Sequence, residues 1–304
     1  MKELKEIIKE NSPQFESYIY GKINEGHIKT EFSSLDKLIG GFLSDELIVL
    51  GARPGMGKTT LMIKLALNQA KKGKKVIIYS LDLSAPRIIL TLIAFLTDMN
   101  AQELNCGLAK EEDREKINEA IKIIEALPIL IEDSNKTIDE IRDELLELKA
   151  KEGVDMIYLD YLQLLGTNHR KPSYKEQEIC SIMKKLKHLT KEINTPIFVN
   201  SSLSRSVETR GGDKRPQLSD LRESGSIEEF ADKVFFILRP EYYGLTEDED
   251  HNSTENMANL ILAKNRNGFV GEIKLYYKHC NGNFDDLNNI EMINYLKDEF
   301  DYGL

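Results

Sequence analysis

The chain has 304 residues, of which 41% are hydrophobic and 30% are charged, and its formal net charge is −10. This length and apolar content are sufficient for a substantial core, and they favour one main domain with short appendages. The negative net charge argues against a protein whose whole surface binds nucleic acid, but it is compatible with a local basic groove.

The three cysteines are odd in number and far apart, which excludes a disulfide framework and a Cys-x-x-Cys metal site. The first ten residues, MKELKEIIKE, carry charges where a signal peptide needs an apolar core. No apolar run approaches the ~18 residues that a membrane span requires. We therefore expect a cytoplasmic protein without a membrane partner.

The first region, residues 1–31, is charged and amphipathic, and we expect a helical linker or appendage there. Its apolar residues recur at helical spacing and would pack on the same domain or on a neighbouring subunit. They are Phe15, Tyr18, Ile19 and Ile23. Residues 32–287 are predicted to form the main domain, and residues 288–304 an acidic C-terminal tail.

A P-loop motif, Ala-Arg-Pro-Gly-Met-Gly-Lys-Thr at 52–59, lies between an apolar strand pattern and a helical pattern, with alanine at its first glycine position. Its two glycines allow successive backbone N–H groups to point at one anion, and the helix that follows adds its positive dipole end. Lys58 is expected to contact the β and γ phosphates, and the Thr59 hydroxyl to bind Mg²⁺. A chance glycine turn with a lysine is the alternative. The expected nucleotide-binding residues are Arg53, Pro54, Gly55, Met56, Gly57, Lys58, Thr59 and Thr60.

Two acidic residues end predicted parallel strands downstream of this motif. Asp82 follows the apolar run 76–81, and in open α/β sheets catalytic groups gather at this edge, so it is a candidate for polarising the attacking water. From spacing alone, Asp82 could equally be the N-cap of the helix that starts near Ser84. Asp160 ends the strand 155–160 and has the form of the second nucleotide motif, whose Asp holds Mg²⁺ through water.

The remaining pattern alternates between helices and strands up to a C-terminal hairpin. Further strands are predicted at 127–132, 195–200 and 233–238, and helices at 86–127, 138–151 and 176–194. The strands 258–263 and 271–277 are predicted to pair as a hairpin.

Two basic segments stand out in the acidic chain. The loop 201–222 carries several cations and is either a phosphate-contacting loop or a solvated linker. The hairpin tip places Lys264 and Arg266 two residues apart, and therefore on one side of an extended strand. Composition alone favours a solvated tip.

Four stretches together resemble the ATPase domain of the DnaB-type replicative DNA helicases, which belong to the RecA-like class. They are 52–59, Asp-Tyr-Leu-Gln-Leu at 160–164, Arg-Pro-Gln-Leu-Ser-Asp-Leu-Arg-Glu-Ser-Gly-Ser-Ile-Glu at 215–228, and Lys-Asn-Arg-Asn-Gly at 264–268. The likeness runs from about residue 30 to about residue 285. It implies an α/β fold with a RecA-like P-loop NTPase core, a mostly parallel central sheet flanked by helices, and a C-terminal β-hairpin.

The resemblance also implies a function in DNA replication. The family forms rings, commonly hexamers, that encircle single-stranded DNA and unwind duplex 5′ to 3′ as ATP is hydrolysed at subunit interfaces. ATP and Mg²⁺ are the implied cofactors, and primase or a helicase loader are further candidate partners. In this likeness residues 1–31 correspond to a linker helix that docks on the next subunit.

The resemblance assigns roles to individual residues. The implied catalytic set is Lys58, Asp82, Asp160, Lys264 and Arg266, and the metal set is Thr59 and Asp160. Lys264 and Arg266 match the pair that reaches the γ-phosphate of the neighbouring subunit. The expected DNA-binding residues are Arg205, Lys214, Arg215, Arg222, Glu223 and Gly225. Contacts of this kind grip the backbone without recognising base sequence.

Two positions depart from the family pattern. Asp82 is one methylene shorter than the usual glutamate, and Ser201–Ser202 replaces the usual Ser-Gln, in which the glutamine senses the γ-phosphate. These departures leave open an ATP-gated DNA-binding ring or scaffold with weak hydrolysis. A RecA-like ATPase with a protein partner and no role on DNA is a third interpretation.

Overall fold

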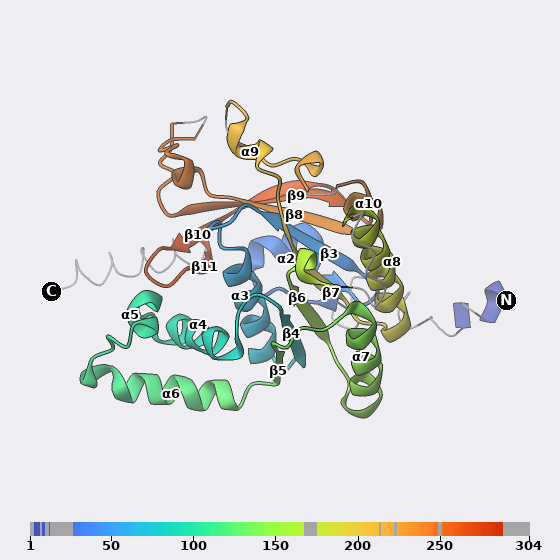
Figure 1. Ribbon diagram of the computed structural model, residues 1–304, viewed down its shortest axis with the longest axis horizontal. Helices are drawn as coiled ribbons and strands as arrows, with labels where there is room; N and C mark the ends of the chain where they lie inside the picture. Colours follow the sequence, from blue (N-terminus) through green and yellow to red (C-terminus); the bar gives the residue numbers. More distant parts are fainter. Residues whose placement is uncertain are drawn as a thin grey trace.

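The computed structural model of this chain describes residues 3–6, 8–9, 12, 27–166, 175–212, 214–221, 224–248 and 251–287. Within these residues, a nine-stranded sheet forms the centre of the molecule and a two-stranded sheet lies beside it. The strand order across the large sheet is β11-β10-β9-β8-β3-β7-β6-β4-β5. Figure 1 shows this sheet with helices around it.

Six parallel strands make up one part of the sheet. They are β3 (Leu47–Ala52), β4 (Val76–Ser80), β5 (Ile129–Glu132), β6 (Met156–Asp160), β7 (Ile197–Ser202) and β8 (Lys233–Leu238). All but β5 are buried along nearly their whole length, which is why continuous apolar runs predicted them. Strand β7 runs on through Ser201 and Ser202, the two serines in which the sequence predicted it to end.

Three antiparallel strands extend the sheet on the other side. They are β9 (Met257–Asn265), β10 (Gly271–Lys278) and β11 (Asn283–Asp286). The predicted hairpin between β9 and β10 is confirmed, whereas β11 was not predicted. The predicted α/β architecture, a mostly parallel sheet with a C-terminal hairpin, is confirmed.

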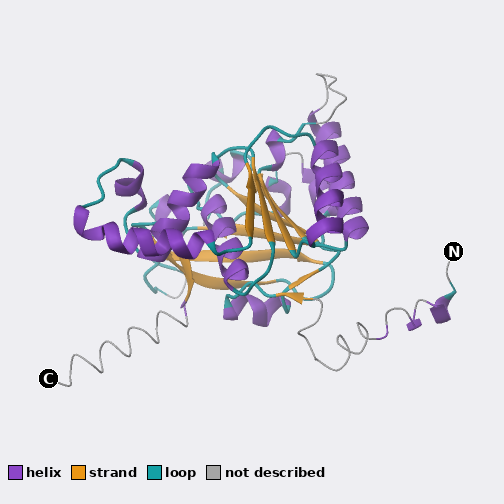
Figure 2. Ribbon diagram, turned by 90° about the horizontal axis from the view of Figure 1, so that it is seen from below, coloured by secondary structure: helices purple, strands orange, loops and turns teal. Residues whose placement is uncertain are grey.

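Helices cover both faces of the sheet (Figures 1 and 2). They are α2 (Ser33–Ile39), α3 (Lys58–Lys71), α4 (Ala85–Thr97), α5 (Ala101–Asn105), α6 (Arg114–Glu125), α7 (Ile138–Glu152), α8 (Lys175–Ile193), α9 (Ser206–Thr209) and α10 (Ser224–Phe230). None of the described helices combines the length and the hydropathy of a membrane-spanning segment.

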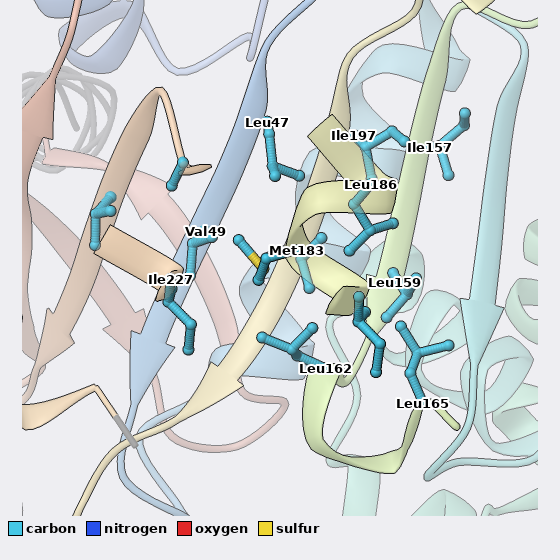
Figure 3. Packing of buried hydrophobic residues seen from close by; sticks show 14 of the residues in the cluster. Leu47, Val49, Ile157, Leu159, Leu162, Leu165, Met183, Leu186, Ile197 and Ile227 are labelled. Carbon is cyan, nitrogen blue, oxygen red and sulfur yellow. The ribbon is translucent and has the colours of Figure 1, made fainter. Parts of the chain in front are cut away.

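Alternating residues of each buried strand pack into two separate cores. Leu47 and Val49 point toward α8, where they join Met183 and Leu186 (Figure 3). Their neighbour Ile48 points to the opposite face and packs with residues of α3 and α4. The strand that leads into the P-loop is therefore fixed from both sides.

The segment that follows the predicted N-terminal helix meets the main domain as a strand. His27–Ile28 forms β1, which pairs with β2 (Phe42–Leu43), and the Gln69 side chain of α3 donates to the carbonyl of Lys29. These hydrogen bonds hold the segment against the domain as a strand. The domain boundary at residue 31 stays a prediction, and the predicted tail 288–304 lies outside the described residues.

Candidate functional site

The P-loop lies at the carboxyl end of β3, directly before α3. Gly55 and Gly57 have φ angles of +80° and +91°, a backbone conformation that strongly favours glycine. A Cβ on Gly57 would lie 2.7 Å from the ring of Phe284, a β11 residue that is fully buried. The loop therefore has the glycine geometry that the sequence predicted, and β11 supports it from behind.

Asp160, at the end of β6, is held by two neighbouring elements. The Thr59 hydroxyl of α3 donates to Asp160 Oδ2 at 2.6 Å. The Asn200 side chain of β7 donates to Asp160 Oδ1 at 2.9 Å. Asp160 is only 1% exposed, so these contacts fix its orientation. The predicted convergence of Thr59 and Asp160 is observed, whereas sequence reasoning gave Asn200 no role in the site.

Lys58 lies beside these residues. Its ammonium is 5.2 Å from the centroid of the Tyr161 ring. Burial lowers the pKa of Lys58, although the charges of Asp160 and Asp82 oppose this effect. An ammonium that has lost part of its hydration is well placed to bind a polyanion that replaces the lost solvent.

A cavity of about 330 Å³ opens over the loop. Its lining residues are Arg53, Pro54, Gly55, Gly57, Lys58, Thr59, Thr60, Asp82, Tyr161 and Ser202. The cavity thus brings together the carboxyl ends of β3, β4, β6 and β7. Met56 is not among these residues because its side chain is buried in the apolar core, 1% exposed.

Asp82 is exposed and lines this cavity. The alternative role as a helix N-cap is wrong, because α4 begins after Ser84, and the Ala85 N–H donates to Asp133 instead. Asp82 is therefore available to act on a group within the cavity.

Arg53 turns away from the phosphate loop toward the segment that follows β7. Its Nε donates to Glu208 Oε1 at 2.8 Å and its Nη1 to the Leu203 carbonyl at 2.8 Å. The side chain is 12% exposed. Arg53 thus connects the P-loop to the segment 203–208 in addition to lining the cavity.

Gln163 follows β6 and holds the end of β7 in place. Its Nε2 donates to Ser201 Oγ at 2.8 Å, and its Oε1 accepts from the Ser202 N–H at 3.1 Å. In the sequence, Gln163 stands within the motif at 160–164 and has no predicted role of its own. A polar residue three positions after the Asp at a strand end was the available signal.

An aromatic and cationic cluster borders the P-loop on the side of β8 and β10. Arg239 donates to the Gly55 carbonyl at 3.3 Å, and its guanidinium lies 3.6 Å from the centroid of the Tyr277 ring. The hydroxyl of Tyr242, a 52% exposed side chain, lies beside Gly55. This cluster forms one wall next to the phosphate loop.

The described residues among those predicted to bind DNA do not line the cavity, and they lie on the segment between β7 and β8. Arg205 is exposed, Lys214 donates to the Arg210 carbonyl, and Arg215 pairs with Glu272. Gly225 lies in α10 and is exposed. Arg222 and Glu223 lie outside the described residues.

This segment is connected to the P-loop by backbone contacts. The Leu203 N–H donates to the Ala52 carbonyl at 3.3 Å, and Leu203 pairs with Leu221 in an antiparallel bridge. The chain therefore returns to the carboxyl edge of the sheet directly before residues 222–223.

Lys264 and Arg266 lie at the opposite edge of the sheet from the P-loop. Strand β9 runs antiparallel to β8 and pairs Asn265 with Lys233, the first residue of β8. Lys264 donates to the Ala231 carbonyl at 2.8 Å, and Arg266 to the Glu229 carbonyl. Both head groups lie on the same side of the hairpin, as predicted, but they are remote from the nucleotide cavity of their own chain.

Comparison with known proteins identifies similar chains. The family model described as "DnaB-like helicase C terminal domain" matches residues 27–286. The Replicative DNA helicase DnaB of Geobacillus stearothermophilus is 38% identical over 252 residues, which are 82% of this chain and 54% of that protein. The Replicative DNA helicase DnaC of Bacillus subtilis gives the same identity and coverage. The chain thus spans about half the length of these curated relatives.

Two solved structures are also similar. A structure titled "ATPase Domain of G40P" has a TM-score of 0.82 and 32% identity, covering 92% of this chain and 98% of that one. A structure titled "The Structure Of A DnaB-Like Replicative Helicase And Its Interactions With Primase" has a TM-score of 0.80 and 31% identity. It covers 91% of this chain, and 66% of that one is matched.

Proposed function

Because the chain belongs to the family of the DnaB-like helicase C-terminal domain, we propose that it is the ATP-hydrolysing part of a replicative DNA helicase. It shares its RecA-like fold with the ATPase domains that it matches. The observation that carries the proposal is the contact of Thr59 with Asp160 beside the phosphate-binding loop. This contact joins an anion site to a candidate cation site.

ATP with Mg²⁺ fits this donor set. The loop offers backbone N–H groups and the Lys58 ammonium to phosphates. The Thr59 hydroxyl and the Asp160 carboxylate are hard oxygen donors, and Mg²⁺ prefers such donors together with water and substrate phosphates. No cluster of three or more His, Cys, Asp or Glu side chains suited to a metal occurs among the described residues. This agrees with Mg²⁺, which takes one or two protein ligands. When bound, Mg²⁺ would neutralise charge on the β and γ phosphates.

Asp82 is the candidate for orienting the attacking water. Its carboxylate is exposed in the cavity that contains Lys58 and Thr59. A carboxylate at this position can accept a proton from water as the water attacks a phosphorus atom. Its short side chain leaves a longer gap to the water than a glutamate would, which predicts slow turnover.

The position of the cationic hairpin supports hydrolysis between subunits. Lys264 and Arg266 cannot serve the nucleotide of their own chain, because β9 carries them to the opposite edge of the sheet. A neighbouring copy in a ring would receive them at its own cavity, where an arginine stabilises the transition state. The adjacent tip exposes Phe269 at 90% and Val270 at 60%, an apolar surface that suits a contact with another copy.

Single-stranded DNA is the proposed track of the ring. The basic segment after β7 begins at the carboxyl edge of the sheet, where its backbone contacts the P-loop. A movement of the P-loop with the nucleotide state would therefore be transmitted to the residues that contact DNA. Contacts of these cations with phosphates would hold DNA of any sequence. By likeness to the family, the ring is a hexamer that moves 5′ to 3′, and primase is a candidate partner.

A second candidate function is an ATP-gated DNA-binding ring with weak hydrolysis. Two observations favour it: the short Asp82 and Ser202, which lines the cavity where the family carries glutamine. Such a ring would bind single strands tightly in the presence of ATP but release little phosphate.

The test is ATP hydrolysis and fork unwinding with and without single-stranded DNA. The wild type is expected to hydrolyse ATP faster with DNA and to unwind a fork. Lys58→Ala should abolish both activities, whereas Lys71→Ala, a matched lysine change at the far end of α3, should retain them. Unwinding that survives Lys58→Ala would contradict the proposal. ATP-dependent DNA binding with negligible hydrolysis would favour the second candidate.

A further inference from the structure

Asp232, between α10 and β8, makes contacts with two other elements, β3 and α8. It is 5% exposed. Its Oδ2 accepts from the backbone N–H of Leu47 at 2.8 Å and from Lys187 Nζ at 2.6 Å. Its own N–H donates to the Leu47 carbonyl at 2.8 Å. These bonds tie Asp232 to the start of β3 and to α8, so its position is set by the core of the fold.

The same residue also holds the hairpin arginine. The Arg266 backbone N–H donates to the Asp232 carbonyl at 2.9 Å. The Arg266 Nη1 lies 3.5 Å from Asp232 Oδ1. The Arg266 guanidinium also donates to the Glu229 carbonyl, and the side chain is 46% exposed, so part of it faces solvent. The two carboxylate oxygens thus have different partners: Oδ2 accepts from Leu47 and Lys187 in the core, and Oδ1 faces Arg266.

Lys264 is anchored nearby on the carboxyl end of α10. It donates to the carbonyls of Glu228 and Ala231. Carbonyls at a helix C-terminus carry partial negative charge and attract cations. Lys264 and Arg266 are therefore held by the same segment, the end of α10 and the residues that follow it. Among the described contacts of Arg266, Asp232 is the only one with a full negative charge.

We propose that Asp232 is the positioning residue that aims Arg266 at the nucleotide of the neighbouring subunit, an inference that rests on the proposed function above. A long, half-exposed arginine loses rotamer freedom when it docks on a phosphate. The Asp232 carboxylate already restrains the Arg266 guanidinium, which reduces that loss and limits the directions in which the side chain extends. Small errors in aim matter, because a misplacement of about 1 Å can cost about a hundredfold in rate.

Asp232→Asn separates the contacts of the carboxylate with the core from its ion pair with Arg266. An asparagine has one acceptor oxygen and one NH₂ donor. When its oxygen takes the Leu47 N–H and Lys187, its NH₂ faces the Arg266 guanidinium, and two donors oppose each other. The fold contacts and the bonds of Arg266 to the Asp232 and Glu229 carbonyls are largely retained, while the ion pair between Asp232 and the Arg266 guanidinium is lost.

The experiment measures ATP hydrolysis in rings assembled from two kinds of subunit. Asp232→Asn alone should lower the turnover of assembled rings by about 10- to 100-fold. Mixing Asp232→Asn with Lys58→Ala subunits should restore turnover. At a mixed interface the Lys58→Ala subunit supplies a correctly held Arg266, and the Asp232→Asn subunit supplies an intact nucleotide site. Mixed with Arg266→Ala subunits it should not be rescued, because neither partner supplies a well-aimed arginine.

The opposite pattern would overturn the proposal. Rescue by Arg266→Ala but not by Lys58→Ala would mean that Asp232→Asn damages its own nucleotide site through Leu47 and β3. Undiminished turnover of Asp232→Asn rings would also overturn it. Lys187→Met is the matched control: it removes the other partner of the carboxylate, and it should lower stability without changing the turnover of assembled rings.

A separate mixture distinguishes this proposal from the proposed function. Arg266→Ala and Lys58→Ala subunits together should show rescue if hydrolysis uses the arginine of a neighbour. No rescue in verified mixed rings would contradict hydrolysis between subunits, whatever Asp232 does. If Asp232→Asn does not assemble, Asp232→Glu is put through the same two mixtures, because it keeps the charge on Lys187 and displaces the carboxylate from Arg266.

Discussion

The substitution Gly57→Ala tests how tightly the P-loop is built. Gly57 has φ +91°, and an added Cβ would lie 2.7 Å from Phe284 Cζ and 2.9 Å from Cε2. The Phe284 ring is fully buried and packs against Tyr277 with centroids 5.0 Å apart, so it has little room to move. Gly73→Ala is the matched control, because Gly73 has φ +77° but nothing within 4 Å of its Cβ position.

The expected costs follow from these two environments. Both variants force alanine into a left-handed conformation, which costs about 1–2 kcal/mol. Gly57→Ala adds overpacking against Phe284, which costs about 1–3 kcal/mol more. Urea unfolding of both variants measures the difference in their free energies of unfolding. It is obtained from the shift of the urea midpoint, provided that the m-value is the same for both variants.

Nucleotide binding gives a second readout of the same pair. Relief of the contact with Phe284 must move the loop that aims its N–H groups at phosphate, so Gly57→Ala should lose the ATP-induced rise in Tm. Gly73→Ala should keep it. Equal losses of stability in the two variants, or an unchanged ATP effect in Gly57→Ala, would refute this description of the loop.

Three further predictions concern buried and exposed charges. Lys58→Met should raise the stability of the nucleotide-free protein, since burial lowers the pKa of Lys58 and the fold therefore disfavours its charged form. That cost is fully present below the folded pKa and is lost as pH rises from the folded pKa to the unfolded value of 10.5. Melting curves of wild type and variant should therefore converge at alkaline pH, and a less stable variant at neutral pH would contradict this. Asp82→Glu should speed ATP hydrolysis in single-turnover assays of assembled rings, and an unchanged or slower rate would count against Asp82 as the water-orienting group. Lys233→Met should cost about 3–5 kcal/mol in urea unfolding because it leaves the charge of Glu46, 1% exposed, without its cationic partner. Adding Glu46→Gln should recover most of that loss, and a double variant as unstable as Lys233→Met would show that the buried charge is not the cause.

The large elements were predictable because each has a local signal. Strand β8 occupies the predicted residues 233–238, since a buried parallel strand reads as a continuous apolar run between polar residues. Strand β11 had no such signal: its four residues, Asn-Phe-Asp-Asp, are mostly polar. It forms because β10 offers a free edge and because Phe284 fills the space behind the P-loop.

The core of the candidate site was also predictable. Lys58 and Thr59 follow from the loop motif, and the carboxyl ends of parallel strands meet at one edge, which places Asp82 and Asp160 there. Asn200 could not be assigned because its contact with Asp160 depends on β7 lying next to β6.

Asp232 and Arg53 depend even more on three-dimensional topology. The contact between Asp232 and Arg266 requires the antiparallel return of β9 beside β8. Arg53 lines the cavity and its role toward the nucleotide stays a prediction, but its bonds to Glu208 and Leu203 involve a segment that packs against the P-loop only in the folded chain.

The central claim is that ATP is cleaved where the cavity of one subunit meets Lys264 and Arg266 of the next. Its most direct test is ATP turnover per subunit, measured across protein concentration while native mass spectrometry reports the fraction assembled. Turnover is predicted to rise with assembly and to be nearly absent in isolated subunits. Isolated subunits that hydrolyse ATP as fast as assembled ones would contradict the claim.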